Sequence, residues 1–523
     1  KAATHRRGFN RMRSVIVTAL LLAFAACTSM ETGRENSAAS RPTNGAAVLL
    51  FPANKATSVN PDTHLVLTFR SAPAIGSSGL VRIYDAADNS LVDTLDLSIP
   101  VSPRPLGRAP PRVAGDVNSG PGPVDPNDKT LYQVNMIGGF DFCFFPIIVH
   151  DNTATIYPHN NALKYGHTYI VRMDPSVLTP RDAKFAGFAN DSWTFTTKAA
   201  APAATAARIV VAADGSGDFN TIQGALDFLP KQSAKRTTIF IKNGRYEEIV
   251  FMHQKSNVTL RGENRDRVQV GYRNNSAFNP SRGGPSRRPA FSVVDSTDIQ
   301  LSTFTVSNYF VGQAEALLVR GERVIIDRMT LNGSGDALTT YGTIYMKDSK
   351  LIGHGDTILA YAALYCERCE LHSIGPFTWT RTPAGGHGNV FINSTFIAID
   401  KPLPCTVSAT DPGQKSKSVL ARLPRNGPGT SAPNFPYAEM VLINCKTQGL
   451  TPEGWGPVED APGFDSSKVH FWEYNTTDMN GRPAEMSARH PIVKQLTLPA
   501  DAKLIADYSR PEFVLNGWKP NVN

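Results

Sequence analysis

The chain has 523 residues, of which 41% are hydrophobic and 19% charged, and its formal net charge is +8. This composition is typical of a soluble globular protein and, at this length, favours two domains and a leader. Five of the positive charges lie in residues 1–26, which contain no acidic residue, so the remainder carries only +3. A mildly basic chain is compatible with a polyanionic substrate, and the lack of a clustered Lys/Arg stripe argues against a nucleic-acid partner.

The first residues have the pattern of an export signal. Residue 1 is a lysine, so translation can begin at Met12, which is followed by a basic residue and an apolar run over 15–26. That run is too short to span a bilayer, and it ends in small residues before Cys27. We therefore predict a signal peptide over residues 1–27.

Residues 24–27 read Phe-Ala-Ala-Cys and resemble the lipobox of bacterial lipoproteins. The resemblance implies lipidation of Cys27 and a membrane anchor through that lipid. Thr28 and Ser29 are similar to the sorting signal of outer-membrane lipoproteins in Gram-negative bacteria. The expected location is therefore the outer membrane of such a bacterium, with simple secretion as the alternative.

Residues 28–46 are rich in Ser, Thr, Asn and Gly and predict a tether. Residues 47–198 contain short alternating strands, at 64–69, 81–84 and 169–173, separated by Pro, Gly and Asn turns, which favours an antiparallel β-sandwich. The segment resembles bacterial Ig-like modules, and it can serve as a spacer or contact carbohydrate. Residues 100–127 predict a long loop, and the Ala/Pro-rich residues 199–207 predict a linker to a second domain, 208–523.

Four cysteines in the two predicted domains are interpreted as buried apolar residues: Cys143, Cys366, Cys369 and Cys445. Cys366 and Cys369 have metal-motif spacing, but no second cysteine or histidine pair follows at zinc spacing. We therefore expect neither a metal site nor a disulfide.

A 20-residue repeat organises the second domain. Residues 327–338 align with 347–358, and a third copy at 367–378 keeps the apolar spacing. Short apolar segments that recur at a fixed period and are punctuated by Gly predict a solenoid of stacked β-strands, a parallel β-helix. Equivalent positions on successive coils then lie about 4.8 Å apart, which would make Asp336 and Asp356 neighbours.

Two carboxylates that close cannot both ionise easily, so one tends to keep its proton while the other is an anion. Such a pair can provide a general acid beside a nucleophile or base. The alternative is that each Asp only accepts backbone hydrogen bonds in its Gly-Xaa-Gly-Asp turn.

The second domain resembles the pectin methylesterase family, carbohydrate esterases that remove methyl groups from galacturonan. The resemblance runs from about Arg208 to Tyr508 and is carried by the opening segment 209–223 and by Gly-Xaa-Tyr-Xaa-Glu at 244–248. It implies an all-β chain in which a right-handed parallel β-helix follows the sandwich. It also implies a carboxylic ester hydrolase that acts on pectin and needs no metal or other cofactor; we expect a monomer.

The resemblance places four catalytic roles on this sequence. Gln313, in a segment that matches the family's QAVAL motif, is expected to stabilise the oxyanion. Asp336 falls on the general acid of the QDTL motif and Asp356 on the nucleophile of the DFIFG motif. Arg422, in a segment similar to LGRPW, is expected to hold the nucleophile, although it can also be a solvated loop arginine. Gly335 departs from the family by replacing the Gln of QDTL, which removes one oxyanion donor.

Five further residues are candidates for substrate contact: Trp379, Arg381, His387, His354 and Trp455. His354 can also tune the carboxylate pair, and each of the others can equally be a loop residue. Three alternatives to a pectin methylesterase stay open. They are a calcium-dependent polysaccharide lyase, a noncatalytic polysaccharide-binding β-helix, and an esterase or thioesterase for another acyl group.

Overall fold

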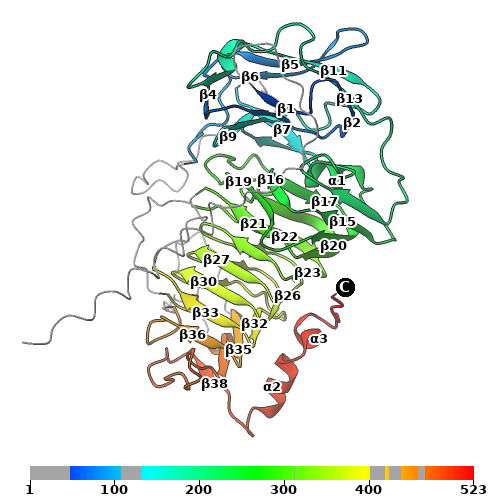
Figure 1. Ribbon diagram of the computed structural model, residues 1–523. Coiled ribbons are helices and arrows are strands. Elements are labelled where there is room, and N and C mark those ends of the chain that lie inside the picture. The colour runs from blue at the N-terminus through cyan, green and yellow to red at the C-terminus, as the bar shows by residue number, and fades with distance from the viewer. Residues whose placement is uncertain are drawn as a thin grey trace, which may run out of the picture. The chain divides into compact units, whose positions relative to one another are not determined.

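The computed structural model describes residues 48–107, 131–310, 312–400, 418–422, 437–456 and 466–522 (Figure 1). The predicted signal, Cys27 and the tether therefore lie outside the described residues, as does most of the long loop predicted at 100–127. All described residues belong to one compact unit, Ser40–Asn523. Within them no helix is long and apolar enough to cross a bilayer.

The N-terminal module has two sheets that contribute to one hydrophobic core. Buried and partly exposed side chains alternate along the strands of this module. In β3, Leu65 and Leu67 are fully buried, whereas Val66 and Thr68, which alternate with them, are partly exposed. The first sheet consists of β1 (Leu49–Phe51), β3 (Leu65–Thr68), β10 (Thr153–Ile156) and β9 (Ile147–His150). The second consists of β2 (Ala56–Val59), β13 (Thr194–Thr197), β11 (Thr168–Met173), β5 (Leu80–Asp85) and β6 (Leu91–Asp96).

Two antiparallel pairs and two short 3₁₀ helices complete the elements outside the two main sheets and the coils. The pairs are β4 (Pro73–Ile75) with β12 (Leu178–Pro180), and β7 (Val134–Ile137) with β8 (Phe140–Cys143). The 3₁₀ helices are η1 (Pro175–Val177) and η2 (Ser466–Lys468).

Stacked coils of parallel strands form the second domain, which confirms the predicted all-β class and the β-helix (Figure 1). Each full coil contributes one strand to each of three faces. The first face contains β14 (Arg208–Val211), β15 (Thr237–Ile241), β18 (Ser256–Gly262), β23 (Val324–Asp327), β26 (Ile344–Lys347), β29 (Leu364–Glu367), β32 (Asn389–Ile392), β35 (Glu439–Ile443), β37 (His470–Tyr474) and β38 (Lys494–Gln495). The second contains β16 (Gly244–Glu247), β19 (Val268–Tyr272), β21 (Thr305–Asn308), β24 (Thr330–Asn332), β27 (Lys350–His354), β30 (Glu370–Ile374), β33 (Thr395–Ala398) and β36 (Lys446–Gln448). The third contains β17 (Val250–His253), β22 (Leu317–Glu322), β25 (Leu338–Thr340), β28 (Ile358–Ala360), β31 (Thr378–Thr380) and β34 (Ala421–Arg422).

The long strand β20 (Phe291–Ser302) joins the first and third faces. Its first half pairs with β17 and β22, and its second half pairs with β18 and β23. The third face therefore continues from β17 through β20 to β34.

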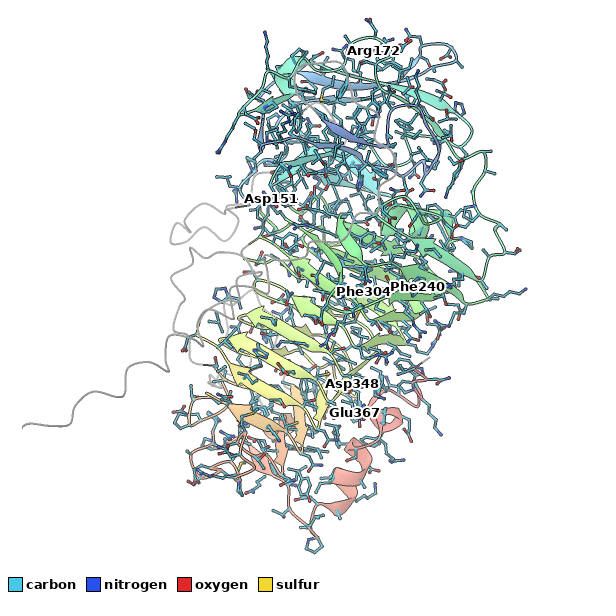
Figure 2. The ribbon with its side chains drawn as sticks, in the orientation of Figure 1. Asp151, Arg172, Phe240, Phe304, Asp348 and Glu367 are labelled. Atoms are coloured by element: carbon cyan, nitrogen blue, oxygen red, sulfur yellow. The ribbon has the colours of Figure 1, made fainter. Side chains whose placement is uncertain are left out.

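The 20-residue repeat is confirmed by the strand pairing. Leu331 lies opposite Leu351, and Leu351 lies opposite Leu371, with all three side chains fully buried. Burying a leucine contributes about 1.5–3 kcal/mol, so one apolar position repeated at this period stabilises each added coil. Phe304, labelled in Figure 2, is likewise fully buried in the core.

Polar side chains also connect successive coils at the turns. Arg368 Nε donates to Asp348 Oδ1 at 2.8 Å across one coil, and Arg368 also pairs with Glu367. Asp348 and Glu367 lie near each other in Figure 2. These exposed pairs contribute little individually, so the apolar interior supplies most of the stacking energy.

Three helices pack against the coils: α1 (Ile222–Phe228), α2 (Ala502–Tyr508) and α3 (Pro511–Val514). Thr221 caps α1 by accepting a hydrogen bond from the Gly224 N–H. Tyr365 on the first face donates to the carbonyl of Ser509 at 2.8 Å, and Tyr508 donates to Glu439 at 2.7 Å. These bonds fasten the segment that carries α2 and α3 to the outer surface of the coils.

The four cysteines interpreted as apolar residues are indeed buried and free. Within the described residues, no group of three or more His, Cys, Asp or Glu side chains is arranged to bind a metal ion.

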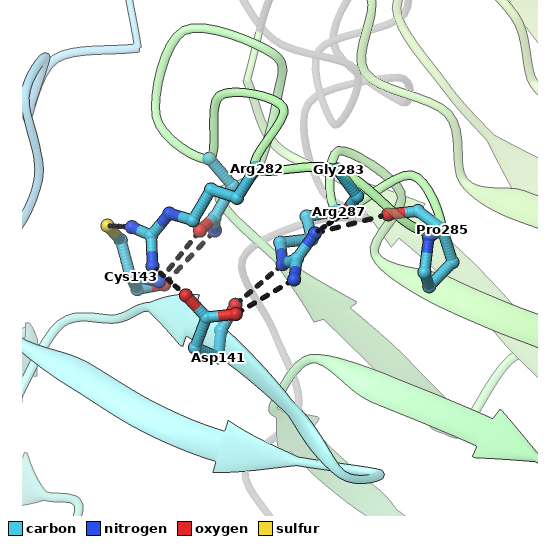
Figure 3. A network of polar contacts seen from close by, with 7 residues as sticks. Asp141, Cys143, Arg282, Gly283, Pro285 and Arg287 are labelled. Carbon is cyan, nitrogen blue, oxygen red and sulfur yellow. Dashed lines mark hydrogen bonds and ion pairs between the residues drawn. The ribbon is translucent and has the colours of Figure 1, made fainter. Parts of the chain in front are cut away.

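Asp141 of β8 binds two arginines from the segment that leads into β20 (Figure 3). Arg282 Nη1 lies 2.5 Å from Asp141 Oδ2, and Arg287 Nη2 donates to Oδ1 at 2.8 Å. Arg287 also donates to the Asp141 carbonyl, and Arg282 donates to Cys143 Sγ. Burial opposes the charge of Asp141, but the two guanidinium groups hold the pKa of this carboxyl below its ordinary value.

We predict that Asp141→Ala lowers the free energy of unfolding by about 3 kcal/mol, because it leaves two mostly buried arginines without their carboxylate. Urea denaturation measures the change. Asp191→Ala, which removes the exposed partner of Arg172 at 3.5 Å, is the control and should cost under about 1 kcal/mol. Equal losses in the two variants would contradict the prediction.

Candidate active site

Glu315, Asp336 and Asp356 occupy equivalent positions on three successive coils. Each lies two residues before the first residue of a paired strand, β22, β25 or β28, and those first residues lie opposite one another. The Ala337 N–H donates to the Thr357 carbonyl at 2.9 Å, so the turns are in register as well as the strands. Since parallel strands are about 4.8 Å apart, three carboxylates form a column at the edge of the third face.

Asp356 is bonded to Arg422, which is the pairing of these two residues that we expected from the sequence. Arg422 Nε donates to Asp356 Oδ1 at 2.7 Å, and its Nη2 binds Oδ2. Two parallel bonds fix the plane of the carboxylate. Asp356 also has a φ of +44°, a left-handed conformation that is unusual for a residue with a side chain and is often found at functional sites.

Asp336 lies between the other two carboxylates and has weaker polar partners. Thr339 Oγ1 donates to its Oδ2 at 3.2 Å, and Arg288 Nη2 lies 3.7 Å away. Burial, and then the negative charges of Glu315 and Asp356, raise the pKa of Asp336 to about 8, although Arg288 acts in the opposite direction. Asp336 therefore carries a proton at neutral pH and can act as a general acid.

Gln313 lies at the rim of the same site, just before β22. Its neighbour Ala314 exchanges backbone hydrogen bonds with Ser334, in the turn that precedes Asp336. Gln313 is exposed and has a φ of +45°. The structure thus brings all four predicted catalytic residues to one edge of the third face.

Trp379 and Arg381 lie beside Arg422 and extend the site along the third face. Trp379 is opposite Arg422 in the strand register, and its ring lies between two guanidinium groups, 3.6 Å from that of Arg381 and 4.3 Å from that of Arg422. Arg381 in turn contacts Tyr361, whose ring stacks on Tyr341 with centroids 4.4 Å apart. These contacts make a continuous aromatic and cationic surface.

A cleft of about 710 Å³ opens next to the column. Its lining includes Gln313, Arg288, Leu318, Tyr341 and Tyr361. A cleft of this volume can accept part of a polymer or a small organic molecule.

Comparison with known proteins identifies the family. A sequence model described as pectinesterase matches residues 208–508, which is more than half of the chain. The chain belongs to the pectinesterase family. This membership confirms the resemblance that the motifs predicted.

The pectinesterase relatives include proteins from plants and bacteria. A pectinesterase/pectinesterase inhibitor from Arabidopsis thaliana is 26% identical over 291 residues, which cover 54% of this chain and 49% of that protein. A pectinesterase from Ralstonia nicotianae is 26% identical over 343 residues, and the match covers 83% of that protein and 55% of this chain. The chain thus spans about half the length of the plant relative.

Among solved structures, the pectin methylesterase PemA from Erwinia chrysanthemi is 21% identical, with a TM-score of 0.47, and the match covers 61% of this chain and 98% of that one.

Two residues expected at the substrate surface have other positions in this pectinesterase fold. The prediction for Trp455 is wrong, because its side chain is only 1% exposed, donates to Glu473 at 2.7 Å and stacks on Phe471. His387 bonds to Glu439 at 3.0 Å and contacts Tyr508 and Phe513 of the C-terminal segment.

The segment that contains Trp455 supports the site indirectly. The Gly456 N–H donates to the Ala421 carbonyl, and a Cβ at residue 456 would lie 2.7 Å from Arg422 Cβ. Glycine therefore allows this segment to pack closely against the arginine that holds Asp356. His354, expected near the pair, links the two turns through its backbone, because its N–H donates to the Gly335 carbonyl at 3.2 Å.

Sequence reasoning missed Glu315 and Arg288. Glu315 replaces the valine of the family's QAVAL motif and lies 21 residues before Asp336, one more than the 20-residue period, so a search at fixed period passed over it. Arg288 is far from every motif in sequence. The signal that could have revealed Glu315 is an acidic residue in an otherwise apolar segment.

Gly335 has a φ of +84°, and a Cβ at this position would lie 3.3 Å from the Gln313 nitrogen. We therefore predict that Gly335→Gln, which restores the glutamine of the family motif, lowers the free energy of unfolding by about 1–3 kcal/mol through backbone strain. It should also fail to raise activity, because the side chain pushes against Gln313. Thermal unfolding and initial rates test both points; a stable, faster variant would contradict them.

Proposed function

We propose that this chain is a carboxylic ester hydrolase that removes methyl groups from pectin, releasing methanol, with Asp356 as the nucleophile. The observation that carries the proposal is the arginine-held carboxylate of Asp356 one coil away from the buried Asp336, whose pKa is raised by that burial. One group is an anion that can attack a carbonyl carbon, and its neighbour holds a proton for the leaving group. Membership of the pectinesterase family supports the choice of ester.

In the first half of the proposed reaction, an Asp356 oxygen bonds to the ester carbonyl carbon and the carbonyl oxygen becomes an oxyanion. The Gln313 amide donates a hydrogen bond to that oxyanion. The bond between the carbonyl carbon and the methoxy oxygen then breaks, and Asp336 gives its proton to that oxygen, so methanol leaves. The polymer carboxyl stays on Asp356 as an acid anhydride.

Water completes the cycle. Asp336, now a carboxylate, takes a proton from a water molecule as the water oxygen attacks the polymer's carbonyl carbon. The bond to Asp356 breaks, Asp356 leaves as a carboxylate bonded to Arg422, and Asp336 is again the acid. The stacked rings of Tyr341 and Tyr361 and the guanidinium groups beside them suit an anionic, sugar-based polymer.

We predict that Asp356→Asn and Asp336→Asn each reduce methanol release from methylated pectin by at least about 10³-fold, because each removes a group that forms or breaks a bond. Gln313→Ala should reduce kcat by about 10²–10³-fold through loss of an oxyanion donor. Asp327→Asn, at the end of β23, is the control and should keep its activity. A fully active Asp356→Asn protein would rule out the proposed nucleophile.

The rate of the first half-reaction should fall as pH rises through about 8, because Asp336 then loses the proton that the leaving group needs. A pH profile of kcat/KM for methanol release measures this alkaline limb. A rate that stays constant from neutral pH to well above 8 would contradict the assignment of Asp336 as the acid.

A second candidate activity is hydrolysis of an ester or thioester with a different acyl group. It is favoured by the apolar side chains Leu318 and Leu359, which line the cleft together with the two tyrosines. Parallel assays on methylated pectin and on short acyl esters distinguish the two activities.

Export to the outer membrane through a lipid on Cys27 stays a proposal based on the sequence of residues 12–29. Metabolic labelling with a fatty acid, compared between the wild type and Cys27→Ser, tests it. Incorporation of label in both proteins, or in neither, would contradict lipidation at this cysteine.

A further inference from the structure

Glu315 is the least exposed member of the carboxylate column, and the mechanism above does not use it. Its side chain has no solvent-exposed area. Its Oε1 accepts a bond from Arg288 Nε at 2.5 Å and lies 3.4 Å from Thr339 Oγ1, whereas its Oε2 is buried without a hydrogen-bond partner. A buried, half-satisfied carboxylate is unfavourable for folding, so its presence beside the reacting groups calls for an explanation.

Charge balance along the column suggests one. Arg288 lies at one end, on Glu315, and Arg422 lies at the other end, on Asp356, with Asp336 between the two pairs. Both guanidinium groups contact the outer members of the column, so three ionised carboxylates would repel one another in a poorly solvated site, and a proton on one of them lowers that repulsion.

The hydrogen bonds indicate which carboxylate holds that proton. Asp356 receives two bonds from Arg422, and Glu315 receives bonds from both Nε and Nη2 of Arg288. Asp336 has only the Thr339 hydroxyl at 3.2 Å and Arg288 at 3.7 Å. Of the three carboxylates, Asp336 therefore has the weakest contacts with a cation, which favours the proton on this middle member.

We propose that Glu315, held by Arg288, is a positioning residue that keeps the transferable proton on Asp336. The effect of Glu315 on catalysis rests on the proposed esterase function. Glu315 places an anion next to the general acid on the side opposite the nucleophile. The acid then holds its proton in the free enzyme, and it regains one from water when the acyl-enzyme is hydrolysed.

Other charged or titratable groups lie near the column in space or in sequence, and the test must separate them from Glu315. Arg422 binds Asp356, Arg381 and Tyr341 interact electrostatically with the column, and Tyr361 stacks on Tyr341. His354 precedes Asp356 by two residues. The arginines stay charged over the range of the test, and burial raises the pKa of Tyr341 to about 12. His354 is the remaining group whose ordinary pKa lies near neutrality, so His354→Gln is included to show that it does not cause the alkaline limb.

The experiment compares pH profiles of kcat/KM for the wild type, Glu315→Gln, Glu315→Asp and His354→Gln. Removing the anion at residue 315 should move the alkaline limb toward lower pH by about one unit or more, because Asp336 then loses its proton more easily. Glu315→Asp keeps the charge, and its limb should lie closer to that of the wild type. Asp327→Asn removes a carboxylate that is also buried and paired with an arginine, and its limb should coincide with the wild-type limb.

A second readout does not depend on activity. Difference infrared spectroscopy follows the protonated carboxyl band of Asp336, assigned by its loss in Asp336→Asn. That band should titrate at lower pH in Glu315→Gln than in the wild type.

The proposal is overturned if a folded Glu315→Gln protein shows the wild-type limb and the wild-type titration of the Asp336 band. It is also overturned if His354→Gln, and not Glu315→Gln, shifts the alkaline limb of the pH profile. If the wild type releases no methanol at any pH, the proposed function fails, while the infrared titration still decides the role of Glu315.

Discussion

The spacing of parallel strands is the constraint on which the site depends. A coil of about 20 residues returns the chain to the same edge of the same face, so an acidic residue repeated at that period meets its copy at about 4.8 Å. No loop has to fold around the pair to bring it together. The fully buried Leu331, Leu351 and Leu371 fix the register, and a shift of one residue would turn them outward. The packing that stabilises the coils therefore also sets the distance between Asp336 and Asp356.

Bringing carboxylates together is unfavourable, and the structure offsets this with cations from residues far apart in sequence. Arg288 precedes the column by one coil, and Arg422 follows it by two coils. Each binds an end member of the column. The two otherwise identical aspartates therefore differ in their surroundings, since Asp356 accepts two bonds from a guanidinium and Asp336 lies 3.7 Å from one.

The sequence predicted what local periodicity determines. The β-helix, the 20-residue register and the pairing of Asp336 with Asp356 all followed from the repeat, and Arg422 followed from a family motif. The prediction that failed depends on burial, which periodicity does not report. Trp455, a candidate for substrate contact, packs on Phe471 in the core.

The contact between the N-terminal module and the coils gives that module a structural link to the site. Asp141 and its backbone carbonyl hold Arg287 (Figure 3). The next residue along the chain is Arg288, which binds Glu315 and lies close to Asp336. The same segment contributes Arg287 and Arg288 to the wall of the cleft. A module without catalytic residues of its own therefore fixes the backbone next to the cation that balances the column. The position of the Arg288 guanidinium beside Asp336 thus depends on Asp141 in the preceding module, because Arg287 and Arg288 are adjacent in the chain.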